Sequence, residues 1–151
     1  MGASGWSYRF PYTSDEAASL HALKEHVVAT GAFIWPFEDD DEEAPTPTTL
    51  DDVSAAQGLQ EYWESGTHSV LDTEGIDADG GSGAIQPLTA AEYLSTFATE
   101  HPTTADVDRV LALGPQNPLE DLIGEPWSGR IATLHDDGRP TEIYVWGWSG
   151  D

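Results

Sequence analysis

Apolar residues recur at helical spacing in several stretches of the chain, and a capping signal opens the first of them. Thr13 and Glu16 stand three residues apart, as the two partners of a capping box do, and Gly31 predicts a C-terminal stop. A helix is therefore predicted between these signals, because its apolar positions repeat every three or four residues. Those positions are Ala17, Leu20, Leu23, Val27 and Val28.

A second helix is predicted between Thr49 and Gly66. Thr49 with Asp52 would cap its start, and the glycine would end it. The apolar face of this helix would consist of Val53, Ala56, Leu59 and Trp63.

Further helices are predicted toward the C-terminal half. Thr89 and Glu92 repeat the capping-box spacing, and this third helix should close before Pro102, because a residue that precedes proline disfavours helical geometry. A fourth short helix is predicted over 103–114, and one or two further turns over 118–123.

Dense runs of β-branched and aromatic residues predict the strands. Residues 33–37 are almost entirely apolar and predict a short strand, and 67–71 predict another. Near the C-terminus, 130–135 and 141–148 flank an Asp-Gly pair within 136–139, which is the strongest short-range hairpin signal. A C-terminal β-hairpin is therefore predicted.

The two ends of the chain share a short sequence echo. Gly-Trp-Ser occurs at 5–7 and again at 147–149. We interpret the echo as two strands that join one sheet, with an internal duplication as the alternative. The predicted fold is a single α+β domain, in which three to four helices pack on a mostly antiparallel sheet that includes the C-terminal hairpin.

A length of 151 residues fits one domain. Residues 1–12 are assigned to an N-terminal segment with a possible strand, and 13–151 to the α+β domain. Two loops are predicted inside it: a mobile acidic loop at 38–49 and a Gly-rich loop at 77–87.

Net charge changes this picture most. The formal charge is −23, and the stretch from Glu25 to Asp108 holds nineteen carboxylates with no lysine or arginine. Such a charge opposes the compact state through self-repulsion, so salt, a metal or a basic partner is expected to offset it. Six Trp, five Tyr and four Phe compensate for a low apolar content of 38%, which favours a folded domain over a disordered acidic tail.

Composition also excludes several classes of chemistry. With no cysteine, the chain has no disulfides, zinc thiolates, iron–sulfur ligands or thiol nucleophiles. No phosphate-binding glycine loop or nucleophile elbow is present, and five basic residues are too few for direct nucleic-acid binding. No apolar run approaches the roughly 18 residues of a membrane span and no secretory signal is visible, so a cytoplasmic location is expected.

Metal-binding patterns are incomplete. The six acids of 38–43 are adjacent, whereas a calcium loop alternates its ligands around a glycine, and 77–82 begins like such a loop but lacks its later ligands. His21 and Glu25 are one helical turn apart and would need a distant third ligand. The histidines that would have to supply it are His26, His68, His101 and His135. We expect no cofactor, no metal ligand and no catalytic residue.

Two interpretations of the charge remain. The first is a non-enzymatic protein that neutralises or masks a basic protein partner such as a toxin, a nuclease or a DNA-binding protein, as an immunity protein, an antitoxin or a nucleic-acid mimic would. The alternative is a halophile-type acidic cytosolic domain of unrelated function, for which hydrolytic or metal-dependent chemistry through His21, Glu25 and a distant histidine stays open.

Under the first interpretation the partner would contact one acidic set and one aromatic set. The aromatic set is Tyr144, Trp146 and Trp148, which fall on one face of a strand because alternate residues point the same way. Packing into the core is the alternative for these rings. The predicted acidic set is Glu38, Asp39, Asp40, Asp41, Glu42, Glu43, Asp51, Asp52, Glu61 and Glu64.

Overall fold

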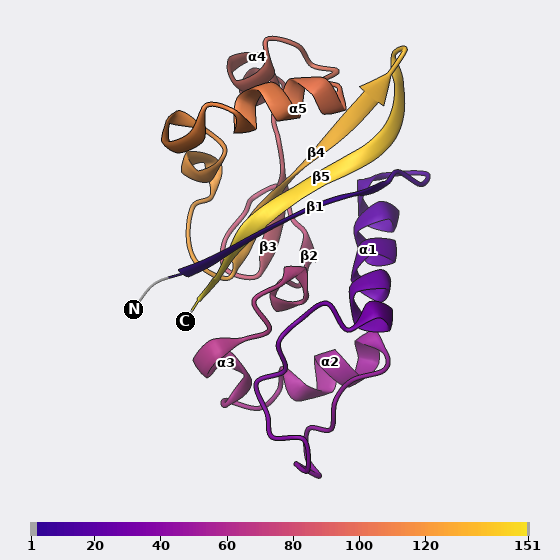
Figure 1. Ribbon diagram of the computed structural model, residues 1–151, viewed down its shortest axis with the longest axis vertical. Helices are drawn as coiled ribbons and strands as arrows, with labels where there is room; N and C mark the ends of the chain where they lie inside the picture. Colours follow the sequence, from indigo (N-terminus) through magenta and orange to yellow (C-terminus); the bar gives the residue numbers. More distant parts are fainter. Residues whose placement is uncertain (1–2, 151) are drawn as a thin grey trace.

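A five-stranded sheet with the strand order β1-β5-β4-β3-β2 runs through the molecule (Figure 1). The computed structural model describes residues 3–150, so the first two residues of the predicted segment 1–12, and Asp151, lie outside the described part. The strands are β1 (Ala3–Pro11), β2 (Gly75–Ile76), β3 (Ala84–Pro87), β4 (Ser128–Asp136) and β5 (Arg139–Gly150).

The sheet is mixed: its two long ladders are antiparallel, as predicted, whereas its two short ladders are parallel, which was not predicted. β5 pairs antiparallel with both β1 and β4, whereas β2, β3 and β4 run parallel to one another. β2 and β3 have two and four residues, which is too short for an alternating pattern to reveal them. The predicted single α+β domain and its C-terminal hairpin are confirmed.

Five α-helices occur in residues 3–150, one more than the upper end of the prediction. Three short 3₁₀ turns accompany them, at η1 (Val70–Asp72), η2 (Gly114–Gln116) and η3 (Glu120–Leu122). The α-helices are α1 (Glu16–Thr30), α2 (Leu50–Ala56), α3 (Tyr62–Ser65), α4 (Ala90–Phe97) and α5 (Thr104–Leu111).

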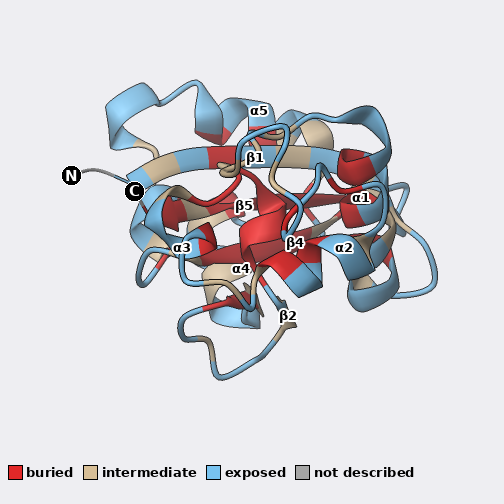
Figure 2. Cartoon of the chain, turned by 90° about the horizontal axis from the view of Figure 1, so that it is seen from below, coloured by how far each residue is buried: buried red, intermediate tan, exposed pale blue. Residues whose placement is uncertain are grey.

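Helices cover both faces of the sheet and create a core on each (Figure 2). On one face, α1, α2, α3 and η1 pack against alternate residues of β4 and β5, among them Ile131, Ile143 and Val145. On the other, α4, α5 and η3 pack against the intervening residues, such as Leu134 and Trp146. The long strands are therefore apolar on both sides, unlike a sheet with one solvated face.

Capping signals located most helix starts correctly. Thr49 with Asp52, and Thr89 with Glu92, form reciprocal capping boxes, as predicted. The first helix is capped differently, because Asp15 accepts the amide of Ala18 at 2.7 Å. Gly31 ends α1 with φ 66°, a left-handed geometry that glycine adopts without strain.

Three predicted segments were wrong. Neither 33–37 nor 67–71 is a strand: the two stretches are irregular and meet through the Ile34 amide, which donates to the Thr67 carbonyl at 3.0 Å, and the second leads into η1. The helix predicted from Thr49 to Gly66 is broken into α2 and α3 by turns around Gly58. The 67–71 stretch is largely buried, whereas 33–37 is half-buried with Ile34 exposed, and tertiary packing rather than strand pairing holds both.

The Gly-Trp-Ser echo is a cross-strand pairing, which confirms that both ends of the chain join one sheet. Trp6 faces Gly147 on one side of the sheet, and Trp148 faces Gly5 on the other. A Cβ at Gly147 would lie 2.5 and 2.6 Å from ring atoms of Trp6, so only glycine leaves room for this indole. Each tryptophan thus packs over the glycine of the opposite strand.

Candidate functional site

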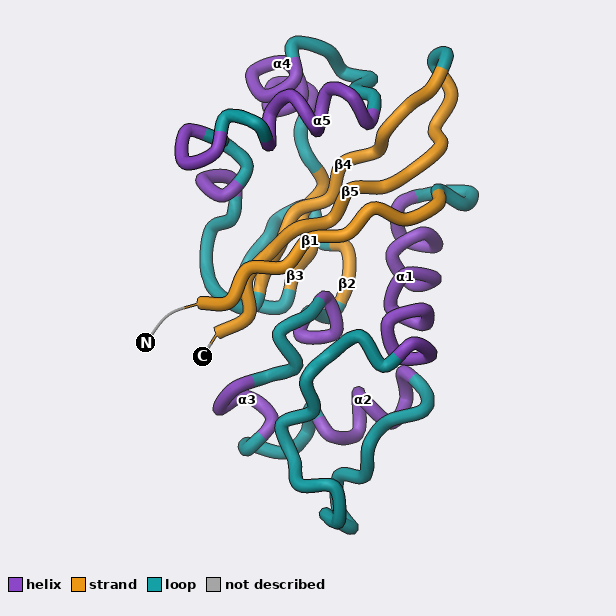
Figure 3. The backbone as a smooth tube through the Cα atoms, viewed as in Figure 1, coloured by secondary structure: helices purple, strands orange, loops and turns teal. Residues whose placement is uncertain are grey.

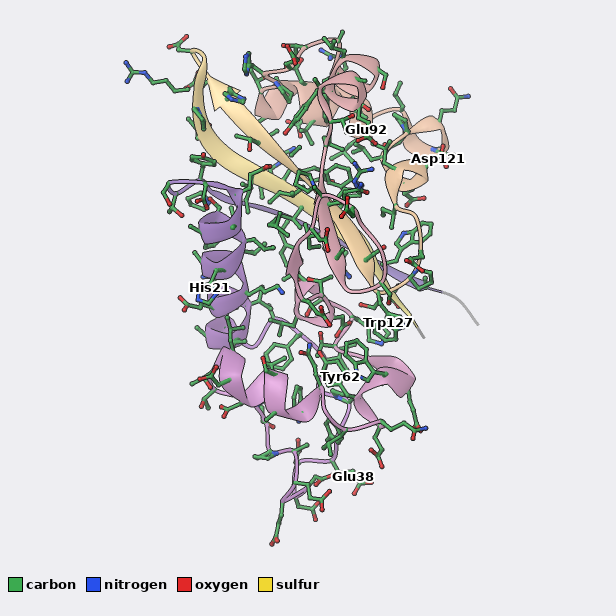
Figure 4. The ribbon with its side chains drawn as sticks, turned by 180° about the vertical axis from the view of Figure 1, so that it is seen from behind. His21, Glu38, Tyr62, Glu92, Asp121 and Trp127 are labelled. Carbon is green, nitrogen blue, oxygen red and sulfur yellow. The ribbon has the colours of Figure 1, made fainter. Side chains whose placement is uncertain are left out.

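All ten predicted acidic residues lie at one end of the molecule. They come from the loop between α1 and α2, from α2, and from α3 with the residue before it, at the lower end of Figure 1 and Figure 3. Figure 4 shows Glu38 at the tip of this end. Nine of the ten are exposed, and Asp41 is half-buried. We call these ten carboxylates and the elements that hold them the acidic pole.

The loop that holds the six consecutive acids is attached to the body at both ends. Trp35 donates from its indole nitrogen to the Ala44 carbonyl at 2.9 Å, and Ala44 itself is buried. Within the run, the Asp41 amide donates to the Glu38 carbonyl at 3.0 Å. Under the loop, the Trp35 ring packs edge-on against Tyr62 of α3, with centroids 6.1 Å apart. These contacts present the acids on a defined surface.

The arginines that form ion pairs lie away from the acidic pole. None of the ion pairs found within residues 3–150 includes one of its carboxylates. Arg9 pairs with Asp108, Arg109 with Asp106 and Arg130 with Glu92, all on the sheet and on α4 and α5. The residues from 32 to 65 contain no lysine, arginine or histidine.

Neighbouring charges in the acidic pole repel one another at physiological salt. Consecutive Cα atoms are about 3.8 Å apart, well inside the Debye length of about 8 Å at 0.15 M ionic strength. Asp52 has a structural role as well, since its carboxylate accepts the amide of Thr48, the hydroxyl of Thr48 and the amide of Thr49. These hydrogen bonds, the Thr48 amide first, hold the pKa of Asp52 below its usual range. The pole can therefore lower its free energy by binding positive charge.

A buried carboxylate that sequence reasoning missed connects the acidic pole to the sheet. Asp72 is 0% exposed and accepts hydrogen bonds from the Tyr62 hydroxyl at 2.8 Å, from the Thr67 amide and hydroxyl, and from the Ser149 hydroxyl. Burial, followed by the charge of Asp72, raises the pKa of Tyr62 far above its ordinary value. Tyr62 belongs to α3 and Ser149 to β5, so Asp72 fixes the pole to the sheet.

Lys24, the only lysine, is a structural cation. It is 8% exposed, and its ammonium donates to the carbonyls of Thr73 and Glu74 at 2.6 and 2.9 Å. Burial lowers its pKa to about 8, against the opposing effects of Glu74 and Asp72. Its charge is therefore directed at the backbone after η1 and not at the acidic pole.

The predicted aromatic set lines a cleft but is mostly buried. Tyr144 and Trp146 stack at 5.2 Å in the core beneath α5, and the Trp146 indole donates to the Leu119 carbonyl at 2.8 Å. Trp148 is half-buried. All three border a cleft of about 330 Å³ between β1, β5 and the turns after α5. The cleft lies on the face opposite to α1–α3, so the two predicted sets do not form one continuous surface.

The alternative metal site gains no third ligand. His21 and Glu25 are hydrogen-bonded at 2.9 Å on the exposed side of α1. No group of three or more histidine, aspartate or glutamate side chains within residues 3–150 is arranged to hold a metal ion.

Two other histidines, His101 and His135, contact each other edge-on, with ring centroids 4.6 Å apart. Burial, together with the charge of His101, lowers the pKa of His135.

No helix in the described part of the chain is long and apolar enough to cross a membrane. Comparisons of the chain with protein-family models, with curated proteins and with solved structures find no match.

Proposed function

We propose that this protein binds a basic protein partner through the acidic pole and neutralises or masks it, as an immunity protein, an antitoxin or a nucleic-acid mimic would. One observation carries the proposal: ten carboxylates without a counter-ion share one end of the molecule, on elements fixed by Trp35, Tyr62 and Asp72. Opposite fields steer association and raise encounter rates toward about 10⁸–10⁹ M⁻¹s⁻¹ at low salt.

The rival account is a surface adapted to high salt, with a function unrelated to charge. Exposed carboxylates on other elements favour it, including Asp79 after β2, Asp121 in η3 and the Asp136–Asp137 pair at the hairpin turn. The two accounts differ in one respect. Binding requires charge at the acidic pole, whereas salt adaptation requires charge anywhere on the surface.

Matched variants test the proposal. The pole variant carries E38Q, D39N, D40N, E42Q and E43Q, and the control variant carries D79N, D121N, E125Q, D136N and D137N. Both remove five exposed negative charges. We expect a basic protein from source lysate to be retained at low salt by the wild type and the control, to elute as salt rises, and to bind the pole variant at least tenfold more weakly. Equal loss from both variants, or no basic protein retained, would overturn the proposal.

A further inference from the structure

A second site lies where the acidic pole meets the sheet, formed by residues distant in sequence. Trp63 of α3, Glu74 before β2 and Trp127 before β4 border a cavity of about 260 Å³, together with Ser82 and Gly83. Figure 4 shows Trp127 close to Tyr62 and α3. The cavity is smaller than the roughly 300–1,000 Å³ typical of sites for drug-sized ligands, so it suits a small chemical group.

Two indoles make perpendicular walls of this cavity. The rings of Trp63 and Trp127 lie 5.1 Å apart at 86°. Trp63 is 37% exposed although it is a large apolar side chain, and its indole nitrogen already donates to the Gln57 carbonyl at 2.9 Å. The walls therefore present aromatic surface, which attracts cations.

The backbone holds Trp127 in an uncommon conformation. Its φ is +63°, which disfavours a bulky side chain, and its amide and carbonyl are fixed by Trp148 and by Gly83. Gly66 and Gly150 leave room for the indole, since a Cβ at Gly66 would lie 2.6 Å from a ring atom and one at Gly150 would also collide with the ring. Strain of this kind is concentrated at functional sites.

Glu74 adds the negative charge. Its amide donates to the Gly83 carbonyl at 2.7 Å, and its exposed side chain lies along Gly83 at the edge of the cavity. A primary ammonium has three N–H donors and a guanidinium has five. Two indole faces and one carboxylate offer few acceptors, so most of these donors would stay unpaired. An ammonium whose hydrogens are replaced by methyl groups needs no acceptors and contacts both rings through its methyl groups.

We propose that Trp63, Trp127 and Glu74 bind a quaternary ammonium group through cation–π contacts and one carboxylate. This site extends beyond the proposed function and stands whether or not the acidic pole binds a protein. The group would come from a free small molecule or from a trimethylated lysine of a protein.

The test uses choline and its uncharged carbon isostere, 3,3-dimethylbutan-1-ol, titrated into the full chain in moderate salt while indole N–H signals are followed by NMR. We expect choline to shift the Trp63 and Trp127 signals and the isostere to bind at least tenfold more weakly. W63A should weaken choline binding about tenfold or more, and W63F less, because tryptophan is the strongest cation–π partner. E74Q should weaken it several-fold, whereas E43Q, with the same charge change on the acidic pole, should not.

Equal binding of choline and its isostere would overturn the proposal, as would equal effects of E74Q and E43Q. A short peptide with trimethyl-lysine separates the two sources. Tighter binding of the peptide than of choline assigns the site to a protein side chain, and equal or weaker binding assigns it to a free ligand. Binding of neither overturns the proposal. The pole variant and the control variant both retain Trp63, Trp127 and Glu74, so the capture experiment does not depend on this result.

Discussion

Replacing Asp72 with alanine is expected to lower the free energy of unfolding by about 3–5 kcal/mol. The substitution leaves the Tyr62 hydroxyl, the Thr67 amide and hydroxyl and the Ser149 hydroxyl without their buried acceptor. Each unsatisfied buried donor costs about 1–3 kcal/mol before relaxation or water entry recovers part of it. Urea unfolding at neutral pH measures the loss.

Asp39→Ala is the matched control, since Asp39 is an exposed acid of the acidic pole, and its effect should stay within about 0.5 kcal/mol. Asp72→Asn keeps the shape but replaces a charged acceptor by a neutral amide, and hydrogen bonds to a charged acceptor are the stronger ones, so it should also destabilise. A loss below about 1 kcal/mol for Asp72→Ala would show that Asp72 does not fix α3 to β5.

Arg130→Gln is expected to cost about 3 kcal/mol. The Arg130 side chain is 6% exposed, binds the Glu92 carboxylate at 2.6 and 2.9 Å, and donates to the carbonyls of Gln86, Pro87 and Leu122. It therefore joins β3, β4, the start of α4 and η3. Because Glu92 is partly solvated, the loss in the free energy of unfolding should fall at the low end of the range for a broken buried ion pair. Arg139→Gln at the exposed hairpin turn is the control and should change little.

The Arg130–Glu92 pair also predicts a pH dependence. Hydrogen bonds from Arg130, the largest cause, lower the pKa of Glu92 from its ordinary value of 4.5 to about 2. Between pH 2 and pH 4.5 the unfolded chain binds more protons than the folded chain does. The contribution of Glu92 to the free energy of unfolding is therefore complete above about pH 4.5 and is lost as pH falls toward 2. The stability difference between wild type and Arg130→Gln should shrink over the same window; a difference independent of pH would contradict the assignment.

Local signals predicted most of the fold. Capping pairs such as Thr89 with Glu92 are complete within four residues, and the Asp-Gly turn at Asp137, with φ +50°, sets the hairpin on its own. Structures that depend on tertiary contacts were not predictable in this way. β2 pairs through only two residues, and the aromatic run at 33–37 packs half-buried against α3 without forming a strand.

The candidate site shows the same division. The six adjacent acids are visible in the sequence, but only folding brings α2 and α3 beside them and separates them from Arg9, Arg109 and Arg130. Asp72 has no sequence signal, because its donors lie up to 77 residues away. Trp63, Glu74 and Trp127 likewise meet only in the folded chain.

Thermal unfolding from a few tens of millimolar to several molar potassium chloride most directly distinguishes a binding pole from a salt-adapted surface. Screening is largely complete near 0.1–0.15 M, where the Debye length is about 8–10 Å. If the acidic pole holds a concentrated, unpaired charge for a partner, Tm rises as salt increases to about 0.15 M and then stays level. This initial rise is smaller in the pole variant than in the control variant. A Tm that climbs through the molar range, equally in both variants, would contradict the account.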